Sequence, residues 1–173
     1  MLLAIDVGNT HAVIGIYEGP ALQASWRAAT DHARTADEWG ALVFTYLLAG
    51  GLSLAAVDAC IVSSVVPPVT AALREMSNRL LGRRALVIEP GLETGVRIAV
   101  DNPREVGADR IVNAAAAYRR YGGPCIVVDF GTATTYDVVS AAGEYLGGII
   151  TPGAEISIDA LYERAAKLPK VEL

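Results

Sequence analysis

The sequence has little of what marks several large classes of protein. Its 173 residues include only two cysteines and two histidines, so neither a disulfide framework nor a clustered zinc site is expected. Charged residues make up 19% of the chain and hydrophobic residues 53%, a composition that excludes a disordered protein. A chain of this length buries about 70% of its unfolded surface and can fold without a covalent or metal staple.

Long hydrophobic runs and a basic surface are also lacking. No stretch of about 18 uncharged apolar residues occurs, so no membrane-spanning helix is expected. The apolar N-terminus has no basic flank and contains Asp6, which favours a strand over a signal peptide. The net charge is −5 and the pI about 5.0, so nucleic acid is not an expected partner. Cys60 and Cys125 lie in apolar runs, which predicts buried free thiols and a cytoplasmic location.

Common catalytic and nucleotide motifs are missing as well. Neither the P-loop pattern G-x-x-x-x-G-K-[ST] nor the Rossmann pattern G-x-G-x-x-G occurs. No G-x-S-x-G elbow or other arrangement of a serine nucleophile is present. Any phosphate chemistry must therefore use a different kind of loop.

The first ninety residues predict three strands and then helix, strand, helix and strand. Thr35 and Glu38 form a capping box in front of a helix that stops at Gly50. Pro67 opens the second helix and Gly82 ends it. The five predicted strands are short runs rich in β-branched residues or alternating in polarity, bounded by turn residues, at 2–8, 11–19, 21–30, 56–66 and 85–90.

The second part of the chain repeats the opening pattern. After a loop over 90–104, with a possible strand at 96–100, a helix is predicted over 104–120. Three strands follow between 125 and 152, and Pro152 begins a last helix that carries Ala165 and Leu168. The segment Ile5–Thr10 matches Val128–Thr134, and such an echo implies a duplicated architecture. The second copy is incomplete, since only three strands and one helix follow its start.

Two loops could hold phosphate. Asp6-Val7-Gly8-Asn9-Thr10 places a carboxylate, an unhindered backbone and two polar side chains after a strand. An ordinary hairpin turn is the alternative, but Asp6 is expected to be buried between Ile5 and Val7, where an unpaired carboxylate is rare. The segment from Asp129 to Thr135 repeats the pattern with hydroxyls. Together they predict two phosphate-binding loops that face each other across a cleft, with Asp6 as a possible divalent cation ligand.

For two further segments, a purely structural interpretation is about as well supported as a functional one. Asn102 to Arg110 combines a glycine, a possible base in Asp109 and an anion clamp in Arg110. The alternative there is an exposed helix N-terminus, which favours acidic residues. Gly147 to Gly153 could bring backbone close to a ligand or a helix, or could simply form a tight turn. His11 follows the first loop and could touch a phosphate, whereas His32 is expected at the surface.

Four motifs, in this order, resemble those of the type III pantothenate kinases. They are Asp6-x-Gly8-Asn9-Thr10, Gly107-Ala108-Asp109-Arg110 with Asn113, Asp129-Phe130-Gly131-Thr132-Ala133-Thr134, and Gly147-Gly148-x-Ile150-x-Pro152-Gly153. The resemblance covers essentially the whole chain. It implies an α/β fold of the actin, Hsp70 and sugar kinase superfamily, built from two ribonuclease-H-like halves. The halves are expected at 1–115 and 116–173, the second one incomplete.

The resemblance also implies a function and a set of site residues. The expected activity is phosphorylation of pantothenate by ATP, the first step of coenzyme A synthesis, with Mg²⁺ and a monovalent cation (K⁺ or NH₄⁺). Asp109 is the implied general base and Asp129 the implied monovalent cation ligand. The pantothenate segment is Gly107, Ala108, Asp109 and Arg110, and the ATP site is Asp6, Val7, Gly8, Asn9, Thr10, His11, Ala12, Val13 and Thr132. A homodimer with its active site near the interface is expected, and the run Asn113–Ala117 is the candidate contact.

Two other functions remain open from the sequence. One is a non-kinase member of the same superfamily, such as a transcription accessory factor, against which the intact Gly107–Arg110 motif argues. The other is an ATPase or phosphatase on the same scaffold. The family's chains continue for roughly half as much again beyond the point that Lys170–Leu173 reaches, which leaves the activity of this chain alone undecided.

Overall fold

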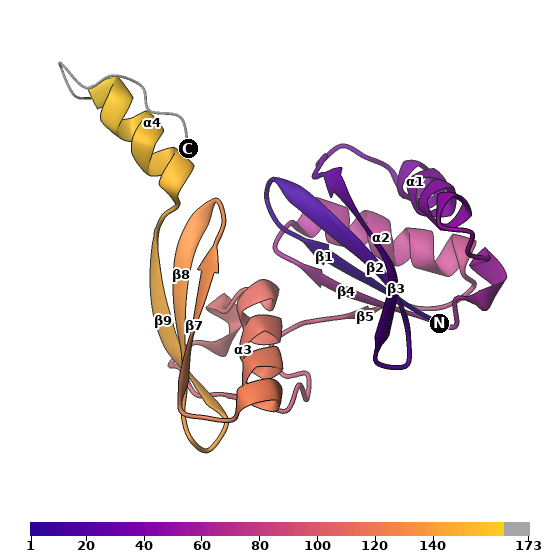
Figure 1. The fold of residues 1–173 in the computed structure, drawn as a ribbon. Coiled ribbons are helices and arrows are strands. Elements are labelled where there is room, and N and C mark those ends of the chain that lie inside the picture. Colours follow the sequence, from indigo (N-terminus) through magenta and orange to yellow (C-terminus); the bar gives the residue numbers. More distant parts are fainter. Residues whose placement is uncertain (165–173) are drawn as a thin grey trace. The chain divides into compact units, whose positions relative to one another are not determined.

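The computed structural model describes residues 1–164, drawn in colour in Figure 1. Contacts divide the chain into two compact units. The first unit is Met1–Leu92 with Gly107–Asp109, and the second is Glu93–Val106 with Arg110–Leu173. The division into halves at 1–115 and 116–173 stays a prediction.

The first unit has the predicted order of three strands, helix, strand, helix and strand. One short 3₁₀ turn at Leu54–Ala56, which the sequence analysis did not foresee, precedes the fourth strand. The sheet order is β3-β2-β1-β4-β5, with β1 antiparallel to β2 and parallel to β4. The elements are β1 (Leu2–Val7), β2 (His11–Glu18), β3 (Ala21–Ala29), α1 (Ala36–Ala49), β4 (Ala59–Ser64), α2 (Pro67–Leu80) and β5 (Leu86–Val87).

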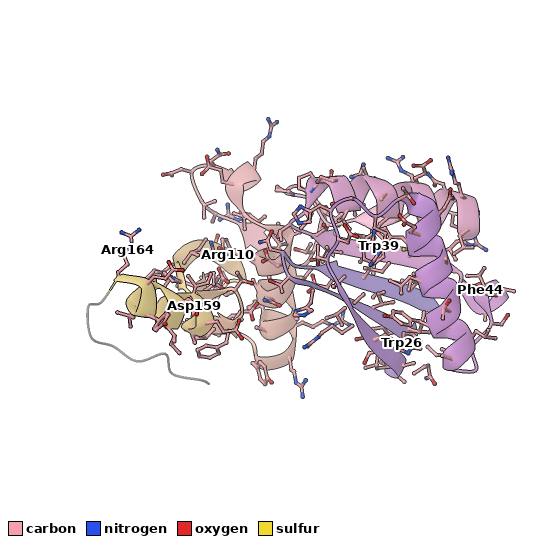
Figure 2. The ribbon with its side chains drawn as sticks, turned by 90° about the horizontal axis from the view of Figure 1, so that it is seen from above. Trp26, Trp39, Phe44, Arg110, Asp159 and Arg164 are labelled. Carbon is pink, nitrogen blue, oxygen red and sulfur yellow. The ribbon has the colours of Figure 1, made fainter. Side chains whose placement is uncertain are left out.

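The core of this unit lies between its sheet and the two helices α1 and α2 (Figure 1). Trp39, labelled in Figure 2, is fully buried in it together with Leu73 of α2. Each such side chain contributes about 1.5–3 kcal/mol through the apolar surface it removes from water. The strands add alternate residues to this core, including Ile5 and Val7 of β1.

The same alternation corrects the expectation that Asp6 is buried. Asp6 is exposed, although Ile5 and Val7 on either side are buried. Successive side chains of a strand point to opposite faces of the sheet. Since Ile5 and Val7 face the helices, Asp6 faces the other way and needs no buried partner.

Both helices begin as the sequence indicates. The backbone N–H of Glu38 donates to the Thr35 hydroxyl, and the backbone N–H of Thr35 donates to the Glu38 carboxylate at 2.8 Å. These bonds complete the capping box. The N–H of Thr35, and then its hydroxyl, donate to the Glu38 carboxylate and lower its pKa, because they stabilise the charged form. Pro67 occupies the first turn of α2, where its missing N–H costs no helical hydrogen bond.

The second unit is built on a sheet of order β6-β9-β8-β7. The predicted helix over 104–120 begins later, at Ala108, because Pro103–Glu105 forms a separate 3₁₀ turn. The last helix is present, but its predicted positions Ala165 and Leu168 lie outside the described residues. The elements are β6 (Arg97–Ile98), α3 (Ala108–Tyr121), β7 (Cys125–Phe130), β8 (Ala133–Val139), β9 (Glu144–Pro152) and α4 (Ala154–Arg164).

The predicted repeat is visible in the strand pairing. In each unit, three consecutive strands form an antiparallel meander, and the first of them ends at an Asp-x-Gly sequence. The prediction for the two cysteines is only half right. Cys60 of β4 is buried, and burial raises the pKa of its thiol to about 11, whereas Cys125 at the start of edge strand β7 is only partly buried. Within residues 1–164, no helix is long and apolar enough to cross a membrane.

Candidate functional site

The turn between β1 and β2 is held in place by a residue that the sequence analysis missed. The Gly8 N–H donates to the His11 carbonyl at 2.9 Å, which closes the turn as a hairpin. Thr30, just after β3, donates its hydroxyl to the Gly8 carbonyl at 2.7 Å and its N–H to the Thr10 carbonyl at 2.9 Å. The ordinary hairpin turn that was the alternative is therefore present, and Thr30 at the end of β3 holds it in place. Nothing in the local sequence links Thr30 to this turn.

The predicted residues of this loop differ in accessibility. Five of them are exposed, Gly8 is half-buried, and Val7 and Ala12 belong to the core. Only the backbones of the two core residues could meet a ligand at this edge. The exposed members are Asp6, Asn9, Thr10, His11 and Val13.

This turn lies at one edge of the sheet with the end of β4. Because β1 and β4 are parallel, Val7 pairs with Ser64, and the Val65 N–H donates to the Val7 carbonyl at 3.1 Å. Helix α2 starts two residues later, so the positive end of its dipole belongs to the same edge, although Pro67 and Pro68 in its first two positions have no N–H to donate. A sheet edge next to a helix dipole of this orientation favours an anionic ligand.

Gly107 lies close to the end of β4 in the same unit. A β-carbon at this position would be 3.5 Å from a methyl group of Val65 and would collide with a carboxylate oxygen of Asp109. The Asp109 side chain therefore turns back over Gly107 and occupies space that a side chain at this position would share. Asp109 is in the first turn of α3, where the helix dipole favours a negative charge.

In the second unit, the turn between β7 and β8 brings two predicted motifs together. The Gly153 N–H donates to the Thr132 carbonyl at 3.0 Å, and Gly131 donates to the Ala133 carbonyl at 3.0 Å. A β-carbon on Gly153 would be 2.6 Å from the Thr132 carbonyl oxygen. The glycine at the start of α4 thus allows backbone-to-backbone contact with the turn that carries Thr132. The sequence analysis expected a close approach of this segment to a ligand or a helix, and the structure shows one to a turn of the same unit instead.

Asp129 lies one residue before the end of β7, beside this turn, and its side chain is exposed. Its carboxylate accepts a hydrogen bond of 3.0 Å from the Asn113 amide of α3. No group of three or more potential His, Cys, Asp or Glu ligands exists in the part of the chain that the structure describes. A cation at Asp129 would therefore take its remaining ligands from water, backbone carbonyls or substrate oxygens, as hard cations commonly do.

Arg110 is engaged with residues that the sequence analysis did not single out. Its Nε donates to Oδ1 of Asp137 at 2.6 Å, and the Tyr145 hydroxyl donates to the same oxygen at 2.7 Å. The side chain of Asp137 is fully buried and that of Arg110 is 14% exposed. The sequence did offer a signal for Asp137: it is a carboxylate two residues before Val139 in the strand 133–139, and alternate residues of a strand share a face, which is buried at both positions.

The comparisons with known proteins agree along the whole chain. The family model described as type III pantothenate kinase matches residues 2–173. A protein of Moorella thermoacetica named type III pantothenate kinase is 56% identical over all 173 residues, which span 68% of its length. One of the same name from Anaeromyxobacter sp. strain Fw109-5 is 58% identical over 99% of this chain and 68% of its own.

Solved structures share the fold at low identity. A Campylobacter jejuni protein described as a Baf family transcriptional activator has a TM-score of 0.58 and 21% identity, over 96% of this chain and 62% of its own. A Sinorhizobium meliloti protein described as a 2-dehydro-3-deoxygalactonokinase has a TM-score of 0.53 and 15% identity, over 96% and 58%. Similarity at this level concerns the fold alone, and it confirms the predicted α/β class with an incomplete second half.

Proposed function

The chain belongs to the type III pantothenate kinase family, and from that membership we propose that the protein phosphorylates pantothenate with ATP in coenzyme A biosynthesis. The match over residues 2–173, at 56% identity to a curated member, carries the proposal. This match disfavours a transcription accessory factor, because the similarity to the Baf family protein, at 21% identity, concerns the fold alone. Since the chain spans 68% of its relatives' length, activity is to be measured on the complete protein.

The ATP site of this proposal is the segment Asp6–Val13 together with Thr132. The first turn offers exposed polar groups and lies at a sheet edge shared with the N-terminus of α2. Backbone N–H groups and hydroxyls of this kind would hold phosphate oxygens. Mg²⁺, when bound, neutralises charge on those oxygens, and the exposed Asp6 is the carboxylate that would hold it, directly or through water.

The pantothenate site of this proposal is Gly107–Arg110, with Asp109 as general base. Phosphoryl transfer depends mainly on positioning and charge stabilisation, and the acceptor alcohol must lose its proton as the bond forms. A carboxylate at the first turn of α3 is favoured in its ionised, proton-accepting form. The fold of the Asp109 side chain over Gly107 supports a defined position for that base.

Asp129 is the proposed ligand of K⁺ or NH₄⁺. Its exposed carboxylate beside the 131–132 turn supports this role, because proteins hold monovalent cations with carbonyl and carboxylate oxygens. The Asn113 amide that donates to Asp129 orients the carboxylate without neutralising it. The cation would then offset part of the negative charge that ATP brings into an acidic protein.

We also propose a cytoplasmic homodimer that uses α3. Ala114 is fully buried within the chain, which supports intramolecular packing for that side of the helix, whereas Ala116 is exposed. A two-fold contact would set the exposed side against its own copy. Sedimentation of the complete protein, with Ala116→Glu as the variant, tests this: the variant should sediment as a monomer. An unchanged dimer would remove α3 from the interface.

The decisive assay follows ADP release with and without pantothenate. A kinase releases ADP only when pantothenate is present and forms a phosphorylated product that mass spectrometry detects. Equal ADP release without pantothenate would favour the ATPase or phosphatase alternative. Asp109→Asn should lower kcat by about 10²–10⁴-fold, the usual range for a general base, while ATP and pantothenate still bind. Turnover near the wild-type rate would refute the role of Asp109.

A further inference from the structure

The guanidinium of Arg110 is anchored in the second unit by one buried carboxylate. Its Nε and Nη2 both lie 2.6 Å from Oδ1 of Asp137, so the planar fork faces that oxygen. The same carboxylate accepts the Tyr145 hydroxyl at 2.7 Å, and the Thr135 hydroxyl lies 3.4 Å from its other oxygen. Figure 2 shows Arg110 where α3 meets the strands of this unit.

Two further features fit the anchor. The Arg110 guanidinium carbon lies 5.8 Å from the centre of the Tyr145 ring, within the range of a cation–π contact. A β-carbon on Gly148 would collide with the Tyr136 carbonyl oxygen and with Nη2 of Arg110, and would lie 3.0 Å from Oδ1 of Asp137. Gly148 therefore leaves the space that the guanidinium occupies. This explains a glycine that the sequence analysis could only describe as permitting close approach.

The cluster of Arg110, Asp137 and Tyr145 fixes the position of the guanidinium more than it stabilises the fold. Burying two charges costs about as much as their attraction returns, so a buried ion pair is weak support for a fold. The hydrogen bonds that Nε of Arg110 and the Tyr145 hydroxyl donate to one carboxylate oxygen do, however, fix where the guanidinium lies. Arg110 is the third residue of α3, and the peptide bond before it belongs to Asp109. Fixing Arg110 therefore restrains the backbone that carries Asp109.

We propose that Asp137 and Tyr145 are positioning residues for phosphoryl transfer. They hold Arg110, and through it the first turn of α3, so that the Asp109 carboxylate meets the acceptor hydroxyl. This inference rests on the proposed role of Asp109 as general base. It gives the Arg110 side chain the task of anchoring the pantothenate segment rather than of binding the carboxylate of pantothenate.

The test is a double-mutant cycle in the complete protein between Tyr145→Phe and Asp109→Asn. Tyr145→Phe removes one hydroxyl and keeps the ring against Arg110. It should lower kcat by about tenfold, since small displacements of a reacting group are costly, and leave the KM for ATP unchanged. In the Asp109→Asn background it should have no further effect on kcat. Tyr136→Phe is the matched control, because Tyr136 lies on β8 beside Asp137 and points to the opposite face; it should keep the wild-type kcat.

Each outcome separates the two proposals. An equal loss of kcat in both backgrounds, or no loss from Tyr145→Phe, overturns the positioning role and leaves Asp109 as the base. Full activity of Asp109→Asn alone refutes the base itself. Arg110→Lys keeps the charge but loses the fork, and should lower kcat as Tyr145→Phe does. If it instead raises only the KM for pantothenate, Arg110 binds the substrate and the anchor proposal is wrong.

Discussion

Replacing Gly153 with alanine should disturb the turn that carries Thr132. The added β-carbon would collide with the Gly131 carbonyl oxygen and lie 2.6 Å from that of Thr132, whereas an ordinary contact begins at 3.4 Å, so the turn must move away by at least about 0.8 Å. Backbone atoms line the clash, and no flexible side chain can yield. Overpacking of this kind costs about 1–3 kcal/mol of stability. The hydrogen bond from Gly153 to Thr132, 3.0 Å long, would be strained at the same time.

The same displacement bears on the proposed ATP contact of Thr132. A shift of about 1 Å in a positioning group costs about 10²-fold in rate, so kcat/KM for ATP should fall by about that factor in the complete protein. Thermal unfolding and initial rates at varied ATP are the two measurements. Gly40→Ala is the matched control, because its β-carbon would lie 3.7 Å from Leu80 and Met76 and alanine favours the helix. Wild-type stability and ATP kinetics in Gly153→Ala would refute the reasoning.

Two further predictions concern a cation and a thiol. K⁺ or NH₄⁺ should stimulate the complete protein more than Na⁺ does, and Asp129→Ala should abolish the difference; equal rates in all three salts would contradict a cation at Asp129. Cys60 should resist iodoacetamide in the native state, since with a pKa of about 11 only about one thiol in a thousand is ionised at pH 8. Mass spectrometry should find it labelled at least tenfold faster in urea, and equal labelling would show that Cys60 is not buried. Because its folded pKa lies above the ordinary 9.0, its contribution to stability is complete below pH 9 and is lost as the pH rises through 11.

Local patterns were enough to predict the main strands and α-helices, but not the two 3₁₀ turns. The capping box at Thr35 and Glu38 forms between residues three apart, and both of its hydrogen bonds are present. The proline at the start of α2 acts through its own ring and missing N–H. The start of the helix predicted over 104–120 was placed four residues too early, because the 3₁₀ turn at Pro103–Glu105 was not distinguished from its first turn. Boundaries depend on such small differences between competing local hydrogen bonds.

The sequence by itself determined the order of strands and helices, the repeated Asp-x-Gly turns and the family, because each depends on residues close together in the chain or on the motifs as a set. Only the tertiary structure decided which face of a strand is covered, and that exposes Asp6 while it buries Asp137. It also paired Arg110 with a carboxylate 27 residues away and set Gly153 against the turn of Thr132. Charge and size limit which residues can meet in this way, but the packing of sheets and helices selects which of them do.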